Sequence, residues 1–378
     1  MSQYKKTLRV GMVGSGFMGK CHANAFRAFG GLFDAPVNIE LYKIADISDA
    51  HAQKSAHALG FARHTGDWQA LVDDPLVDIV SITAPNALHE QIALRAIAQG
   101  KTVYCEKPLS ITSASAHTMM LAAEQAKIAN LVGFNFLRNP LISVCREMIS
   151  SGELGEIISF KGRHAENYMI DAALPHSFRT DAQGGGAVAD IGSHIVSLAR
   201  YLLGDIREVT SRSRTVVASR PVALGSTEHA PVEVDDLAHA LLQFSSGVVG
   251  SIDVNWMATG RSMDLSFEVT GTKGALAFSQ ERMNELRVWE AGKSAGFGGF
   301  KKIETGPDHA PYGNFCPAAG HHLGFNDLKI IEVSQLIETM LSGKPNFTDF
   351  REGYRVQCAI DAILRSATSG QWEAVEGI

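Results

Sequence analysis

Leu8–Gly19, with the sequence LRVGMVGSGFMG, is the stretch that decides the fold of the N-terminal part of the chain. Its apolar residues Leu8, Val10 and Val13 predict a short buried strand. Gly14–Gly19 follows with the spacing GxGxxG, which is typical of the strand-to-helix turn that holds a dinucleotide pyrophosphate. In such a turn the glycines allow the tight bend, the approach of the phosphates and the close packing of helix on strand. We therefore expect the N-terminus of the next helix to bind a dinucleotide through free N–H groups and the helix dipole.

A second predicted strand, Ile39–Ala45, follows a loop that begins at Gly30. The strand ends at Asp46, where a dinucleotide-binding unit places the acidic residue that binds the adenosine ribose hydroxyls. No arginine follows directly, and a carboxylate would repel a 2′-phosphate, so the sequence favours NAD over NADP. The alternative interpretation is that Asp46 merely caps the next helix.

Strands and helices alternate as far as about residue 132. Strands are predicted at 77–82, 102–104 and 131–132, and helices at 86–98 and 112–126. This alternation implies a parallel, doubly wound sheet, which binds ligands at the carboxyl ends of its strands. Two of these strand ends carry polar residues, in Thr83–Asn86 with His89 and in Glu106–Pro108.

The pattern changes after about residue 133. Helices are predicted at 139–149, 187–203, 330–340 and 350–364, and a mobile loop at 291–299. Beyond Gly204 apolar residues alternate with polar ones, as in Ile252, Val254 and Trp256, which predicts a mostly antiparallel sheet with one covered face. We therefore predict an α/β protein of two domains. An NAD-binding Rossmann domain would span residues 1–132. A substrate-binding and oligomerisation α+β domain with a large open sheet would span 133–378, and its C-terminal helices could pack back on the first domain.

Composition excludes several classes of partner. The 378 residues carry a net charge of −6 without a basic run, which argues against nucleic acid and anionic membranes. The five cysteines are scattered and never form a CxxC pair, which favours reduced thiols in the cytoplasm over disulfides or a zinc site. No apolar stretch approaches the roughly 18 residues that span a bilayer, and the N-terminus runs into the first strand without room for a signal peptide.

The helix predicted at 187–203 carries a candidate acid–base pair. Asp190 and His194 lie four residues apart, so on a regular helix the carboxylate can orient the imidazole and raise its basicity, as a general base requires. Two alternatives stay open: a structural Asp–His pair, or a metal site that shares these ligands but lacks an evident third one.

Lys107 is a second candidate, because it follows a strand end beside Pro108, where the nicotinamide of a bound dinucleotide would lie. A lysine there can stabilise the alkoxide character that develops during hydride loss. The alternative interpretation is an ordinary surface lysine.

Three motifs carry a family resemblance: GMVGSGFMGKCHA at 11–23, TAPNALHEQIALRAIAQGKTVYCEKPLS at 83–110 and GGGAVADIGSHIVSLARYLLG at 184–204. In this order they resemble the glucose–fructose oxidoreductase/inositol dehydrogenase (Gfo/Idh/MocA) family, above all its levoglucosan- and inositol-dehydrogenase-like members. The resemblance spans the whole chain and places the family's catalytic residues on Lys107, Asp190 and His194. The expected cofactor contacts are Gly14, Ser15, Gly16, Phe17, Met18, Asp46, Thr83, Pro85, Asn86, His89, Glu106 and Lys107. It also implies a cis Lys107–Pro108 bond and a homodimer or homotetramer formed through the C-terminal sheet.

The resemblance implies an NAD-dependent dehydrogenase that oxidises a secondary hydroxyl of a sugar, anhydrosugar or cyclitol, without a metal. His194 would take the hydroxyl proton, Asp190 would orient His194, and Lys107 would stabilise the developing oxyanion. Ser197 stands where family members often carry an aspartate that helps to bind polyol hydroxyls, which leaves the exact substrate open. Further substrate contacts are expected from Asn135, Arg138, Tyr312 and His321.

Two alternatives keep the fold and change the activity. One is an enzyme that cleaves glycosidic bonds through transient oxidation and regenerates its NAD. The other is a non-catalytic dinucleotide or sugar sensor, against which the presence of Lys107, Asp190 and His194 argues.

Overall fold

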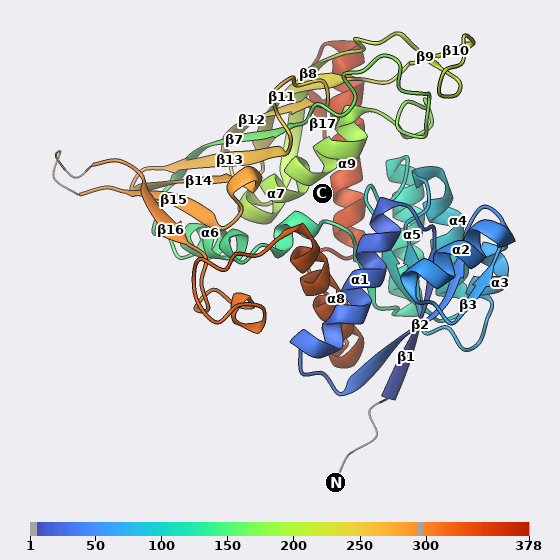
Figure 1. Cartoon of the computed structure of the whole chain (residues 1–378). Helices are drawn as coiled ribbons and strands as arrows, with labels where there is room; N and C mark the ends of the chain where they lie inside the picture. Colours follow the sequence, from blue (N-terminus) through green and yellow to red (C-terminus); the bar gives the residue numbers. More distant parts are fainter. Residues whose placement is uncertain (1–5, 293–295, 297, 378) are drawn as a thin grey trace. The chain divides into compact units, whose positions relative to one another are not determined.

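The computed structural model describes residues 6–292, 296 and 298–377 (Figure 1). Part of the loop expected to be mobile, at 293–295 and 297, lies outside the described residues. The chain divides into two compact units: Met1–Arg138 with Gly324–Tyr354, and Asn139–Leu323 with Arg355–Ile378. No helix in the described part of the chain is long and apolar enough to cross a membrane.

The first unit is built on a sheet that we call the parallel sheet. Within the described residues its strands are β1 (Lys6–Val13), β2 (Val37–Ala45), β3 (Arg63–Thr65), β4 (Ile79–Ile82), β5 (Thr102–Cys105) and β6 (Asn130–Val132). They are ordered β3-β2-β1-β4-β5-β6, and every pairing among them is parallel. This is the strand order of a dinucleotide-binding fold, so the predicted doubly wound sheet is confirmed. Its strands β4 and β5 are buried on both faces, as a sheet covered by helices on both sides requires.

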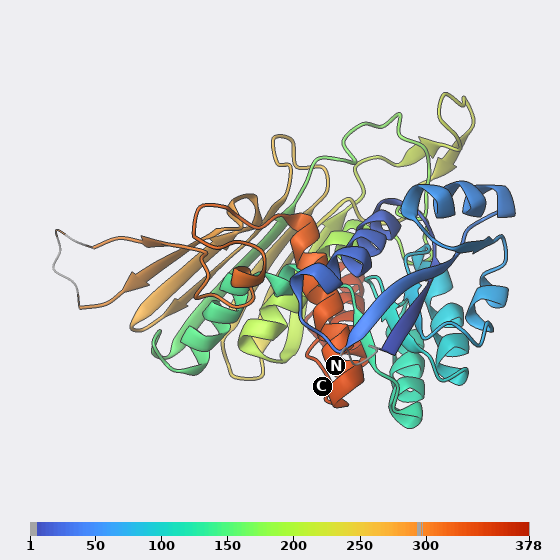
Figure 2. The same cartoon turned by 60° about the horizontal axis from the view of Figure 1, so that its bottom comes forward.

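Helices of the first unit are α1 (Phe17–Leu32), α2 (Asp49–Leu59), α3 (Trp68–Val72), α4 (His89–Ala98), α5 (Ser113–Ala126) and α8 (Phe325–Ser342), with 3₁₀ turns η1 (Asn86–Leu88) and η2 (Asn135–Arg138). Helix α8 packs along α1 in both views, although some 300 residues separate them (Figures 1 and 2). The loop predicted to begin at Gly30 was wrong, because α1 continues to Leu32. Stacking of Phe29 on Phe33, with ring centroids 5.8 Å apart, holds this end of the helix and outweighs the weak helix propensity of two glycines.

The second unit is built on a sheet that we call the large sheet. Within the described residues its strands are β7 (Ile157–Ala165), β8 (Ile206–Arg214), β11 (Leu237–Phe244), β12 (Val249–Asn255), β13 (Asp264–Gly271), β14 (Gly274–Ser279), β15 (Glu285–Glu290), β16 (Lys301–Glu304) and β17 (Glu373–Ala374). Their order is β16-β15-β14-β13-β7-β12-β11-β8-β17, and only the β7–β12 pairing among them is parallel. The predicted, mostly antiparallel sheet is therefore confirmed.

Helices α6 (Pro140–Ser150), α7 (Ser193–Leu203) and most of α9 (Phe350–Ser369) complete the second unit, with a separate strand pair β9 (Ser219–Pro221) and β10 (His229–Pro231). Helix α7 covers one face of the large sheet at β7, where Gly162 allows the close approach. A Cβ at Gly162 would lie 2.7 Å from Ile195 of α7. Along β11 the side chains of Ala240 and Leu242 are buried, whereas Leu241 between them is exposed, so the opposite face is open.

Candidate active site

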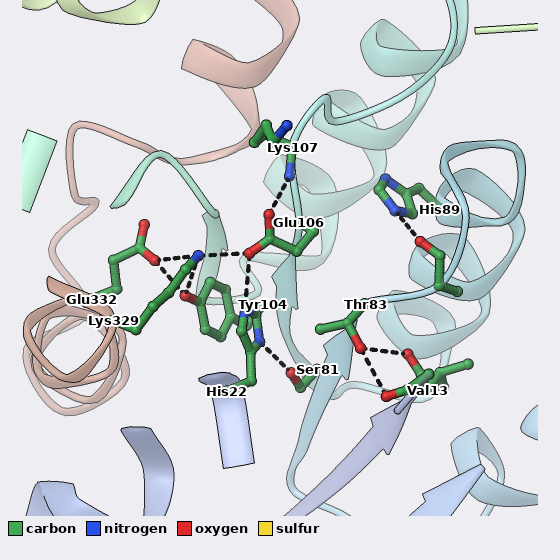
Figure 3. Close-up of polar contacts among 12 residues, drawn as sticks. Val13, His22, Ser81, Thr83, His89, Tyr104, Glu106, Lys107, Lys329 and Glu332 are labelled. Carbon is green, nitrogen blue, oxygen red and sulfur yellow. Dashed lines mark hydrogen bonds and ion pairs between the residues drawn. The ribbon is translucent and has the colours of Figure 1, made fainter. Parts of the chain in front are cut away.

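The turn between β1 and α1 is shaped for a large anion. Gly14 has a φ of +97°, and a Cβ there would lie 2.7 Å from the carbonyl oxygen of Thr83. The Thr83 hydroxyl donates to the carbonyls of Val13 (3.1 Å) and Gly14 (2.8 Å), which fixes the turn against the end of β4 (Figure 3). Gly16 is the N-cap residue of α1, and a Cβ there would meet nothing within 4 Å. The helix N-terminus therefore opens onto free space without a capping side chain, which fits a dinucleotide pyrophosphate.

Asp46 stands at the end of β2. Its carboxylate accepts the Ile47 N–H at 2.7 Å and the hydroxyl of Ser15, which lies in the glycine turn. Ser48, and not Asp46, caps α2, because the Ser48 hydroxyl accepts the His51 N–H. The alternative interpretation of Asp46 as the helix cap was therefore wrong. Its carboxylate instead lies beside the glycine turn.

Two loops at the carboxyl ends of β4 and β5 are joined by His89. Its buried ring lies between the carbonyl of Ala84, 2.9 Å from Nε2, and the carbonyl of Pro108, 2.9 Å from Nδ1. Burial lowers the pKa of His89, so the neutral ring has one N–H to donate to these two acceptors. His89 was expected to contact the cofactor directly. This geometry instead favours a structural role, in which His89 connects the loop that carries Asn86 to the loop that carries Lys107.

Glu106 and Lys107 follow β5 directly. The buried Glu106 carboxylate accepts hydrogen bonds from Lys329 Nζ (2.6 Å), His22 Nε2 (2.9 Å) and the Lys107 backbone N–H (3.2 Å) (Figure 3). Burial opposes its charge, yet the Lys329 ammonium and the His22 hydrogen bond hold the pKa of Glu106 well below its usual range. The Lys107–Pro108 bond is cis, as expected. Lys107 therefore comes directly after a carboxylate that three hydrogen bonds hold in place.

In the second unit, the helix that carries Asp190 and His194 differs from the regular one predicted. Val188–Gly192 forms a π-helical turn, and α7 begins only at Ser193. Asp190 therefore lies in the π-helical turn and His194 in the first turn of α7, four residues further along the chain. Asp190 Oδ2 accepts hydrogen bonds from the hydroxyl of Tyr168 and Nε of Arg179, both at 2.9 Å.

A second histidine lies beside the π-helical turn. His164 on β7 is buried, with Nδ1 2.7 Å from the Ile191 carbonyl and Nε2 2.9 Å from Glu166. Its ring centroid lies 5.6 Å from that of His194. The sequence analysis missed His164, Glu166, Tyr168 and Arg179. They lie outside the predicted helix, and only the run HAENY after a strand could have pointed to some of them.

The residues expected to contact the substrate differ in burial and in their hydrogen-bond partners. Asn135 and Arg138 of η2 are buried in the first unit, where Arg138 Nη2 donates to the Thr348 hydroxyl. Tyr312 is fully buried, and its hydroxyl donates to the Ala318 carbonyl and accepts the His322 N–H, so this geometry favours a structural role over a substrate contact. His321 is exposed in the same loop.

Ser197 on α7 is fully buried, and its hydroxyl has no hydrogen-bond partner among the residues described. In the same part of the chain, no group of three or more histidine, cysteine or acidic side chains could hold a metal ion. The structure brings Glu106, Lys107 and His89 together in the first unit. Asp190 and His194 lie in the second.

Known proteins resemble the chain over its whole length. Residues 8–134 match the model of an oxidoreductase family with an NAD-binding Rossmann fold, and residues 142–277 match the GFO/IDH/MocA C-terminal domain. Levoglucosan dehydrogenase of Pseudarthrobacter phenanthrenivorans is 34% identical over 99% of this chain and 99% of that protein. Inositol 2-dehydrogenase of Rhizobium meliloti is 30% identical over 75% of this chain and 78% of that protein.

Solved structures of similar proteins support the same family assignment. Levoglucosan dehydrogenase in complex with NADH and levoglucosan has a TM-score of 0.94 at 35% identity, covering 99% of this chain and 100% of that one. An NAD-binding oxidoreductase from Klebsiella pneumoniae has a TM-score of 0.92 at 38% identity, covering 98% and 99%. The chain is therefore an NAD-dependent oxidoreductase of the Gfo/Idh/MocA family, which includes dehydrogenases of sugars, anhydrosugars and cyclitols.

Proposed function

We propose that the protein oxidises a secondary hydroxyl of a sugar, anhydrosugar or cyclitol with NAD. The observation that carries this proposal is the full-length likeness to a levoglucosan dehydrogenase whose solved structure holds NADH and levoglucosan. Lys107, Asp190 and His194 supply the groups that the chemistry needs. An anhydrosugar such as levoglucosan is the first substrate to test.

The cofactor site consists of residues from the first unit. When bound, NAD supplies the nicotinamide C4 that accepts a hydride. The open N-terminus of α1 at Gly16 holds the pyrophosphate, and the Asp46 carboxylate binds the adenosine ribose hydroxyls. Other contacts come from the turn and the strand-end loops: Gly14, Ser15, Phe17, Met18, Thr83, Pro85, Asn86, Glu106 and Lys107.

The residue that transfers the proton belongs to the second unit. His194 accepts the substrate hydroxyl proton on a ring nitrogen as the carbon loses its hydride. Asp190, whose Oδ2 accepts hydrogen bonds from Tyr168 and Arg179, orients the His194 ring. The Lys107 ammonium donates a hydrogen bond to the substrate oxygen and stabilises its negative charge while the proton leaves.

The open face of the large sheet offers a surface for a second copy of the chain. Leu241 and Val249 on this face are 53% and 56% exposed. We expect light scattering to give a dimer or a tetramer, and Leu241→Glu to shift it toward the monomer. The described cysteines form no disulfide, which supports a location in the reducing cytoplasm.

The direct test is a screen of the purified protein with NAD and NADP against levoglucosan, inositols and common aldoses, followed by the absorbance of reduced cofactor. Formation of NADH with one polyol supports the proposal. Tight cofactor binding without net reduction on any polyol contradicts it and favours cofactor recycling or sensing, which an assay of glycoside cleavage then separates.

A further inference from the structure

Lys329 on α8 is a lysine with no access to solvent. Its ammonium donates to Glu106 Oε1 (2.6 Å) and to the Tyr104 hydroxyl (3.3 Å), and it forms an ion pair with Glu332 Oε2 at 2.9 Å (Figure 3). The Tyr104 hydroxyl in turn donates to Glu332. Burying an ammonium is costly unless its partners are anions in good geometry, and this arrangement meets that condition.

Both oxygens of Glu106 accept hydrogen bonds. Its Oε1 accepts from Lys329 and His22, and its Oε2 accepts the Lys107 backbone N–H. Burial lowers the pKa of His22 to about 4, so His22 is neutral: it donates from Nε2 to Glu106 and accepts from the Ser81 hydroxyl at Nδ1, 2.8 Å away. Lys329 is therefore the cation that balances Glu106.

The space around Glu106 is fitted to the carboxylate. A Cβ at Gly133 would lie 2.7 Å from Glu106 Oε1, so no larger residue fits beside it. The Gly133 N–H donates to the Cys105 carbonyl at 2.9 Å, which holds this segment along the end of β5. The absence of a side chain at Gly133 therefore leaves the space that the Glu106 carboxylate occupies.

We propose that Lys329 is a positioning residue for the reaction, which acts by keeping Glu106 an anion and so clamping the turn that presents Lys107. The catalytic part of this inference rests on the proposed function of Lys107. The electrostatic part, that Lys329 keeps Glu106 charged, stands on the geometry alone.

Without Lys329, burial would be the largest influence on the pKa of Glu106. Burial raises the pKa of Glu106, and the Lys329 ammonium is the largest effect that opposes it. The titratable groups that face Glu106 are Cys21 and His22 on α1, His89 on α4, Tyr104 and Cys105 on β5, Lys107 beyond β5, and Lys329 and Glu332 on α8. In Lys329→Met the His22–Glu106 pair is therefore expected to take up a proton well above pH 4.5, the ordinary pKa of Glu106.

The test is the thermal unfolding midpoint of wild type and Lys329→Met between pH 5 and pH 8. Wild-type Glu106 has a lowered pKa, so its stabilising contribution is present above pH 4.5 and is lost as the pH falls below that. In Lys329→Met the sign reverses, because a carboxyl with a raised pKa destabilises the folded state when the pH rises. The deficit of the variant is therefore expected to be largest at pH 8 and to shrink toward pH 5.

Matched variants separate this effect from general damage. Glu332 also loses its cation in Lys329→Met, because the Lys329 ammonium opposes the rise that burial causes in the pKa of Glu332, so the variants are compared in a Glu332→Gln background. In that background Glu106→Gln/Lys329→Met removes both remaining charges, so the pH dependence of the deficit is expected to disappear while the fold is retained. Glu338→Gln, exposed on the same helix, is expected to behave as wild type. A deficit of Lys329→Met that stays constant from pH 5 to pH 8 would overturn the proposal, and so would a pH dependence that persists in the double variant.

Kinetics test the positioning role. Lys329→Met is expected to lower kcat about 10²-fold with a smaller change in KM, because a displacement of about 1 Å at a catalytic group costs that much. Its kcat is also expected to gain an ionisation that the double variant lacks. Unchanged kcat with the predicted unfolding behaviour would leave Lys329 as the counter-ion and overturn its positioning role. If wild type oxidises no polyol, the proposed function fails, and the unfolding experiment still decides the charge of Glu106.

Discussion

Asp235 holds the start of the segment that carries Asp190 and His194. Its side chain Oδ2 accepts the Val188 N–H at 2.8 Å, and its backbone carbonyl accepts the Ala187 N–H at 2.9 Å. Burial raises the pKa of Asp235 from 3.8 to about 6, against the hydrogen bond from Val188, which lowers it. At neutral pH the folded protein therefore contains an ionised carboxylate whose charge is less favourable than it is in the unfolded chain.

The magnitude follows from the two pKa values. Their difference of about 2 pH units corresponds to about 3 kcal/mol, at 1.36 kcal/mol per unit. Between pH 3.8 and about 6 the folded state binds more protons at this site than the unfolded state, so stability falls as the pH rises through this window. Asp235→Asn removes the titration and keeps an oxygen for the Val188 N–H. The free energy of unfolding of the variant minus that of wild type is therefore expected to increase by about 2.4 kcal/mol from pH 4 to pH 8, because the unfolded-state carboxyl is already partly ionised at pH 4.

Urea unfolding of both proteins, followed by circular dichroism at matched pH values, measures this difference. Glu233→Gln removes the same charge from an exposed position two residues away, so it serves as the control with a flat difference. A difference for Asp235→Asn that stays flat from pH 4 to pH 8 would refute the reasoning, because it would mean that Asp235 does not titrate in this window.

Three further predictions concern the candidate active site. Lys107→Ala and His194→Ala are each expected to lower kcat by roughly 10²–10⁴-fold, the contribution typical of a positioned acid or base, and near-normal turnover of both in steady-state assays would contradict their roles. Gly14→Ala is expected to weaken NADH binding in a fluorescence titration at least tenfold, because a Cβ at φ +97° would meet the Thr83 carbonyl. The matched control, Gly31→Ala in α1, has free space and is expected to raise stability by about 0.5–1 kcal/mol without weakening NADH binding. Asp46→Ala is expected to raise the KM for NAD and to reduce the preference for NAD over NADP, and an unchanged preference would count against the ribose contact.

Local patterns in the sequence were sufficient for much of the fold. The buried strand Leu8–Val13, the glycine turn and the strand ends at Thr83 and Glu106 are short-range features, and the period-two stretches predicted the large sheet. The π-helical turn at Val188–Gly192 was not predictable in this way. Its N–H groups are satisfied partly by Asp235, a residue 47 positions away, and hydrophobic spacing carries no information about such a partner.

The buried ion pair shows the same limit more clearly. Ile330, Val333 and Ile337 on α8 predict one buried stripe, so Lys329 and Glu332 would be expected on the solvent side. Both are fully buried. Lys329 donates a hydrogen bond to Glu106, which lies 223 residues away in the sequence, and Glu332 accepts one from the Tyr104 hydroxyl. Burial of a charge depends on its partner in space, and a single sequence does not name that partner.

This pairing also sets an order of events during synthesis of the chain. The strands of the parallel sheet are complete once residue 132 has left the ribosome, but Lys329 is joined 223 residues after Glu106. At a synthesis rate of roughly 5–20 residues per second, Lys329 is added roughly 10–45 s after Glu106, which has no counter-ion from Lys329 until then. A nascent chain that ends at Arg138 holds an acidic group that must stay protonated or remain in water, so the N-terminal sheet reaches its final electrostatic state only after Lys329 has been added.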